Sequence, residues 1–119
     1  MEKENIIKVK SYEFALSIIK LAKSLKVDVA SSVLIKQLIR SGTSVGANVE
    51  EAIGGVSKKD FIHKMSISHK EARESNYWLR LLKDSNSLEL SIVDPLINQS
   101  EELIKILFVI IRNSRANGL

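Results

Sequence analysis

The stretch FIHKMSISHKEARESNYWLRLL, residues 61–82, carries the strongest structural signal in the chain. Apolar or small residues recur in it at alternating steps of four and three: Phe61, Met65, Ser68, Ala72, Ser75, Leu79 and Leu82. This spacing places their side chains on one face of an α-helix through three heptads. Just before it, Ser57 and Asp60 form a variant of the capping box that begins helices. The stretch therefore predicts a long helix over about residues 58–83, with one face in a helical core.

Three further segments have the same helical periodicity: residues 11–25, 32–53 and 92–114. We expect Ser11 to cap the first of them and Gly54-Gly55 to end the second. Pro95 fits the first turn of the last one, where a missing N–H costs little. Because the connections are short, consecutive helices must run antiparallel. The sequence thus predicts an all-α protein, in which residues 1–119 form a single antiparallel up-down-up-down four-helix bundle.

The core of this bundle is expected to hold the large apolar side chains of the four periodic faces. These are Phe14, Leu38, Val45, Phe61, Met65, Leu79, Leu103 and Leu107. Gly42 and Gly46 lie on a neighbouring face of the second helix, where each costs up to about 1 kcal/mol of helix stability. We expect them to permit close approach of another helix, although a locally frayed helix is the alternative.

The composition is that of a globular protein, with 45% hydrophobic and 27% charged residues. Cysteine is absent, which excludes disulfides and thiolate metal ligands. No signal peptide is visible, and the longest apolar run, residues 106–111, is far shorter than the ~20 residues of a membrane span. We therefore expect a cytoplasmic protein that does not contact membranes. The net charge of +4 mildly favours an acidic partner.

Catalytic and metal-binding patterns are weak. Asp60 and His63 have helical i, i+3 spacing but stand alone, whereas a di-iron bundle needs Glu-x-x-His on two helices and further inward glutamates. Serine and threonine are plentiful, but no base is positioned to activate one as a nucleophile. The sequence therefore predicts no enzyme activity, no catalytic residue, no metal site and no cofactor.

A polar stripe follows one side of the second helix and includes Arg40, Ser44, Asn48 and Glu51. The tight Gly-Gly turn and the antiparallel third helix place Arg40 near Glu71 and Glu74. The stripe has two interpretations. One is an ion pair between the helices, with hydrogen bonds that fix their register. The other is a pocket for a ligand.

A second stripe, here called the basic stripe, follows the third helix and consists of Lys70, Arg73, Tyr77 and Arg80. Three cations and an aromatic ring on one face, with no carboxylate among them, suit a phosphate backbone and a stacked base. Lys58, Lys59 and Lys64 lie near the start of the same helix and extend the candidate surface. The alternative is an ordinary solvated helix face.

Apolar residues also lie outside the expected core on three helices. They are Tyr12, Leu16, Ile19, Ile67, Trp78, Leu81, Ile106 and Val109. A monomeric bundle helix needs only one apolar stripe of about 100°. Second stripes on three helices therefore predict contacts between subunits of a homo-oligomer.

The string RSGTSVGANVEE, residues 40–51, resembles a motif of the 23S ribosomal RNA intervening-sequence proteins, also called four helix bundle proteins. The matching positions are Arg40, Ser41, Ser44, Ala47, Asn48 and Glu51. Residues 57–61, followed by Glu74, are similar to the third helix of that family, and the resemblance extends over about residues 3–112. It implies a four-helix bundle that is encoded within insertions in ribosomal RNA genes, or related to proteins encoded there.

The chain is also similar to the accessory proteins of diversity-generating retroelements. Those proteins are basic pentameric barrels that bind nucleic acid and a reverse transcriptase. This similarity implies a homopentamer and a ribosomal RNA or reverse transcriptase context. Our leading hypothesis is a non-catalytic homo-oligomeric module that binds RNA or DNA through the basic stripe. The alternative is a structural or protein-interaction subunit with no nucleic-acid role.

Overall fold

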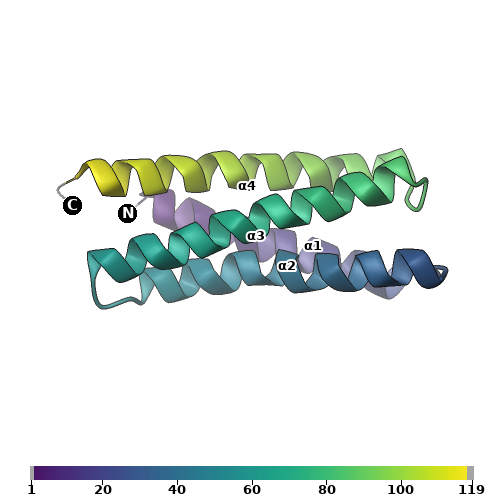
Figure 1. Ribbon diagram of the computed structural model, residues 1–119, viewed down its shortest axis with the longest axis horizontal. Coiled ribbons are helices and arrows are strands. Elements are labelled where there is room, and N and C mark those ends of the chain that lie inside the picture. Colours follow the sequence, from purple (N-terminus) through teal and green to yellow (C-terminus); the bar gives the residue numbers. More distant parts are fainter. Residues whose placement is uncertain (1, 118–119) are drawn as a thin grey trace.

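Four helices make up the computed structural model, which describes residues 2–117 of the chain (Figure 1). They are α1 (Glu2–Ser24), α2 (Val29–Ile53), α3 (Lys58–Asp84) and α4 (Leu90–Ala116). Over residues 2–117 there is no β-strand. The all-α fold predicted from the periodicity is confirmed.

The helices run alternately up and down along a rod of 49 × 20 × 19 Å (Figure 1). Each helix packs against two neighbours in the ring order α1, α2, α3, α4 and back to α1. The seam between α2 and α3 is the most extensive, and that between α1 and α4 is the least extensive. As a result α1 and α3 lie diagonally opposite each other. Within the described part of the chain, none of these helices is long and apolar enough to cross a membrane.

Side-chain and backbone caps define the ends of α2 and α3. Asp28 begins α2, and its carboxylate accepts a hydrogen bond of 2.8 Å from the backbone N–H of Ser31. The Ser57 hydroxyl begins α3 by accepting from the N–H of Asp60 at 3.0 Å, as the capping pattern predicts. The N–H of Gly54 donates to the Glu50 carbonyl and ends α2. These caps keep the connections short and the neighbouring helices antiparallel.

The prediction that the first helix begins near Ser11 is wrong, because α1 begins at Glu2. Ser11 is fully buried inside the helix, where its hydroxyl donates to the Lys8 carbonyl at 3.2 Å. Ile7 is also fully buried, one four-residue step before Ser11. The core stripe of α1 therefore continues through Ser11. A small polar residue suits both a helix cap and a close-packed core position, so the sequence pattern alone does not distinguish the two.

The core holds seven of the eight predicted side chains, and Phe61 is the exception. Phe61 is only partly buried, and Ile62 takes its place in the core. Position 62 lies on the side of α3 that faces α4, because Asn76, two heptads later, hydrogen-bonds Ser100 of α4. Figure 1 shows α4 continuing past the first turn of α3, whereas α2 ends short of it. The α2 side of that turn, where Phe61 lies, is therefore less covered.

The two glycines within α2 sit where α1 crosses it. A Cβ atom on Gly42 would meet the side-chain end of Ile18, with a Phe14 ring carbon 3.7 Å away. A Cβ atom on Gly46 would lie 3.3 Å from the Ser11 hydroxyl oxygen and 3.5 Å from its backbone. The predicted close helix approach is confirmed. At both positions α1 lies so close that only glycine, whose side chain is a single hydrogen atom, leaves room for it.

Candidate functional site

The polar stripe of α2 contacts α3 through Arg40. The Arg40 Nη1 atom lies 3.4 Å from a Glu71 oxygen, and Nη2 contacts Glu74. Gln37 accepts a further hydrogen bond of 3.2 Å from Arg40 Nε. The contact that the antiparallel register predicts is therefore present, and one guanidinium bridges two carboxylates. Such a bridge favours a single alignment of the two helices.

Small hydroxyl side chains continue this seam into the core. The Ser75 hydroxyl donates to the Ser41 hydroxyl at 2.9 Å, and Ser68 donates to the Val45 carbonyl at 2.8 Å. The Asn48 amide donates to the Ser44 carbonyl within α2, also at 2.9 Å. Ser41, Ser68 and Ser75 therefore form hydrogen bonds between α2 and α3, which suits the interpretation of the polar stripe as an element that fixes helix register.

The three lysines near the start of α3 do not form one surface. Lys64 pairs with Glu51 of α2 at 3.0 Å and so faces the seam. It precedes Arg73 by nine residues, which turns it about 180° away from the basic stripe. Lys58 donates to the Asn117 carbonyl near the end of α4, and Lys59 is exposed. Lys64 therefore lies on the α2 side of α3, apart from the basic stripe, with its charge paired to Glu51.

The basic stripe lies along the exposed side of α3, where all four of its residues reach solvent. Together with Glu74, Asn76 and Ile104 they line a shallow cavity of about 480 Å³ between α3 and α4. None of the ion pairs among the described side chains includes Lys70, Arg73 or Arg80. Glu74, the acidic residue in this cavity, is bound by Arg40 and by the Trp78 indole N–H at 3.1 Å. The stripe thus presents charge that other side chains do not neutralise.

Neighbouring side chains orient Arg80 within the stripe. Its Nε donates to the Asn76 side-chain oxygen at 2.9 Å, and the Asn76 amide in turn donates to Ser100 of α4 at 2.9 Å. The guanidinium carbon lies 5.7 Å from the centre of the Tyr77 ring, a cation–π distance. Because Asn76 is fixed to α4, Arg80 is held over Tyr77, and its remaining N–H groups can bind an anion.

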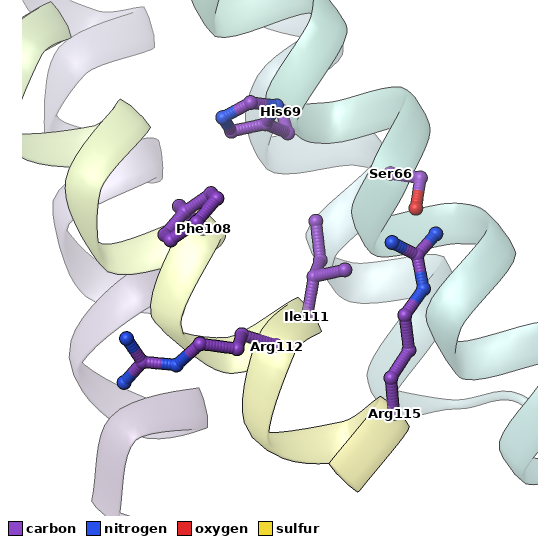
Figure 2. A pocket seen from close by; sticks show the side chains of 6 residues that line it. All are labelled: Ser66, His69, Phe108, Ile111, Arg112 and Arg115. Carbon is purple, nitrogen blue, oxygen red and sulfur yellow. The ribbon is translucent and has the colours of Figure 1, made fainter. Parts of the chain in front are cut away.

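A second cavity, of about 470 Å³, lies farther along the same two helices (Figure 2). Its lining comes from α3 and from the C-terminal half of α4: Ser66, His69, Phe108, Ile111, Arg112 and Arg115. These α4 residues are not among the site residues predicted from the sequence. The signal was available, since Phe108, Arg112 and Arg115 follow each other at steps of four and three on one helix side.

His69 lines this second cavity from α3. Burial, and next the nearby Arg73 cation, lower the pKa of His69 below its ordinary value. Its ring centre lies 6.5 Å from that of Phe108, with the two planes tilted by 45°. Near neutral pH the His69 side chain is therefore an uncharged aromatic ring beside Phe108.

The eight apolar residues outside the predicted core fall into two groups. Leu16 and Ile19 line a hollow between α1 and α4, and Ile106 and Val109 line another along the same seam. Tyr12 lies on α1 with 58% of its surface exposed. The other group is on α3, diagonally opposite α1, and all three of its members are partly buried: Ile67, Trp78 and Leu81. The two groups do not form one continuous face.

The fold places the chain in the class of small antiparallel four-helix bundles, and an arginine–glutamate bridge joins its second and third helices. The chain belongs to the 23S rRNA-intervening sequence protein family, whose model matches residues 3–109. It is similar to a protein of unknown function from the S23 ribosomal protein family of Bacteroides thetaiotaomicron, known from a crystal structure. The identity is 42% and the TM-score 0.84, over 92% of this chain and 98% of that one. No curated protein matches the chain.

Proposed function

We propose that the protein is a non-catalytic, homo-oligomeric module that binds RNA or DNA through the basic stripe of α3. The observation that supports this proposal is that three cations with no carboxylate partner among the described side chains line one shallow cavity together with the exposed Tyr77 ring. Lys10, Arg40, Lys64 and Lys83 each pair with a carboxylate, whereas the three cations of the stripe do not. Cations without an ion-pair partner can contact phosphates, and the exposed Tyr77 ring beside them can stack on an unpaired base.

The apolar surface supports the oligomeric part of the proposal. A cyclic oligomer uses two different faces of each subunit, so that each copy contacts one neighbour on either side. Two separate apolar groups, one at the α1–α4 seam and one on the opposite helix, suit such an arrangement. The family resemblance implies five subunits. A ring would repeat the basic stripe, and weak contacts would then add through effective concentration.

The experiment is a binding titration with matched charge reversals. Fluorescence anisotropy at low salt would measure the affinity of labelled single-stranded RNA for the wild type and for the double variant Arg73→Glu/Arg80→Glu. The control is Lys26→Glu/Lys36→Glu, which makes the same change in net charge at exposed positions away from the stripe. We expect the first variant to lose most of the affinity and the control to lose little.

Equal losses in the two variants would mean that net charge, and not the stripe, attracts the nucleic acid. Absence of binding by the wild type at low salt would contradict the proposal. The apolar groups would then favour the alternative, a structural or protein-interaction subunit. The ribosomal RNA gene or reverse transcriptase setting that the family resemblance implies would remain compatible with either function.

A further inference from the structure

The second cavity between α3 and α4 combines an exposed aromatic ring with apolar and cationic side chains. Neither the packing of the core nor an ordinary helix surface requires this combination. Phe108 leaves 55% of its surface exposed beside the neutral ring of His69. Ile111 is 8% exposed and forms an apolar floor. The volume of about 470 Å³ lies within the range of small-molecule sites. A flat, apolar group of ligand size would therefore fit against the Phe108 ring.

Cationic and hydroxyl groups surround this apolar part. Figure 2 shows the Arg115 side chain extending from α4 toward Ser66 of α3, and that of Arg112 extending the opposite way. None of the ion pairs among the described side chains includes either arginine. Arg115 and the Ser66 hydroxyl can thus donate hydrogen bonds to an anion at the α3 side of the cavity. Arg112 adds positive charge at its outer edge.

We propose that this cavity is a nucleotide subsite, in which an unpaired base stacks on Phe108 while Arg115 and Ser66 hold a phosphate. The proposal rests on the proposed function, which it extends from α3 to the α3–α4 groove. His69 precedes Tyr77 by eight residues, about 12 Å along the helix axis. A short single strand could therefore occupy both the subsite and the basic stripe. A free nucleotide has the same chemistry and is the other source of such a ligand.

The experiment uses the full chain and three probes: a labelled single-stranded oligouridylate, a duplex of equal length, and uridine monophosphate as a competitor. The variants are Phe108→Ala and Arg115→Gln. The controls are Val33→Ala, which removes exposed apolar surface on α2, and Lys36→Gln, which removes an exposed cation on the same helix. Light scattering on each variant reports whether the oligomer is retained.

We expect Phe108→Ala to weaken single-strand binding about fivefold or more, with a smaller effect on the duplex, because only an unpaired base can stack. Arg115→Gln should weaken binding and make the salt dependence of the binding constant less steep by the contribution of about one phosphate contact. Competition by uridine monophosphate that disappears in Phe108→Ala would identify a free nucleotide as a ligand. Strand binding without such competition would identify the strand.

Three results would overturn the subsite. If Phe108→Ala and Arg115→Gln bind like their controls while Arg73→Glu/Arg80→Glu is impaired, the subsite fails and the proposed function stands. If the wild type binds no strand, both fail. If Phe108→Ala changes the oligomer mass, the cavity is a contact between subunits, and the nucleotide assignment is wrong.

Discussion

At the scale of single residues, Arg40 contacts three side chains: Gln37, Glu71 and Glu74. It is about half exposed, but Glu71, one of its two carboxylate partners, keeps only 13% of its side chain exposed. Removing the guanidinium leaves a largely covered carboxylate without its cation. We expect Arg40→Ala to lower the free energy of unfolding by about 1 kcal/mol.

Arg40→Lys provides the matched comparison, because it retains the charge but has one nitrogen for two carboxylates. It should recover only part of the loss in urea denaturation. Full recovery would show that charge alone matters, and an Arg40→Ala protein as stable as the wild type would show that the bridge does not stabilise the seam.

His69 makes stability depend on pH in a defined direction. Burial and the Arg73 cation lower the pKa of His69 in the folded state, so the unfolded chain binds the proton more readily. The α4 residues that line its cavity are Phe108, Ile111, Arg112 and Arg115, and none of them supplies a negative charge that would offset the burial of the imidazolium. The free energy of unfolding should therefore fall as the pH drops below about 6.5, the ordinary pKa of histidine.

His69→Gln should remove this contribution and flatten the pH dependence between about pH 5 and pH 8. Thermal or urea denaturation of the two proteins across this range provides the measurement. A wild type that becomes more stable on acidification relative to His69→Gln would reverse the sign and contradict the assignment.

At the scale of the helices, α3 was predicted closely because its repeat is long and both ends carry turn or cap residues. Most of the core could be predicted in the same way, since apolar side chains at helical spacing have few other arrangements. The start of α1 could not, because Ser11 suits both a cap and a small buried position. The burial of Ile62 in place of Phe61 depended on where α2 and α4 end, which no local pattern encodes.

The candidate site was predictable only in part for a related reason. The basic stripe lies on one helix and follows from its spacing, whereas the second cavity needs α3 and α4 side by side. The pairing of Lys64 with Glu51 likewise depends on packing between helices. Sequence periodicity predicts which residues share a face, but their neighbours follow only from the assembled bundle.

Close approach of α1 and α2 gives a test at Gly42. Helix propensity alone would make Gly42→Leu more stable by about 1 kcal/mol, since glycine is a poor helix former. The packing of Ile18 and Phe14 against Gly42 predicts the opposite, because a new side chain there overfills the core by about 1–3 kcal/mol. The control is Ala47→Leu, at an exposed position of the same helix. A Gly42→Leu protein more stable than this control would mean that the two helices separate at little cost.

Leu79 tests the register of α3, because it is fully buried in the core stripe near the C-terminal end of this helix. Leu79→Ala should lower the free energy of unfolding by about 2–5 kcal/mol through loss of apolar contacts and a residual cavity. Urea denaturation measures the change. A loss below about 0.5 kcal/mol, the usual limit for surface substitutions, would show that the core lies elsewhere.

At the scale of the whole molecule, the exposed apolar groups predict self-association. Leu16 is 51% exposed in the hollow between α1 and α4, where a second copy would cover it. Light scattering should give a mass well above the 13.3 kDa of one chain, and Leu16→Glu should reduce it. A monomer at every concentration would contradict the oligomeric assembly and would leave these groups exposed to water.

The salt dependence of single-strand binding tests whether the basic stripe contacts phosphates. If Lys70, Arg73 and Arg80 contact phosphates, the logarithm of the binding constant should fall linearly with the logarithm of salt concentration, by about 0.7 per contact. The double variant Arg73→Glu/Arg80→Glu should make that slope less steep by the contribution of two phosphate contacts. It should also weaken binding to every sequence alike. An unchanged slope in this variant, or a wild type whose binding does not respond to salt, would contradict the account.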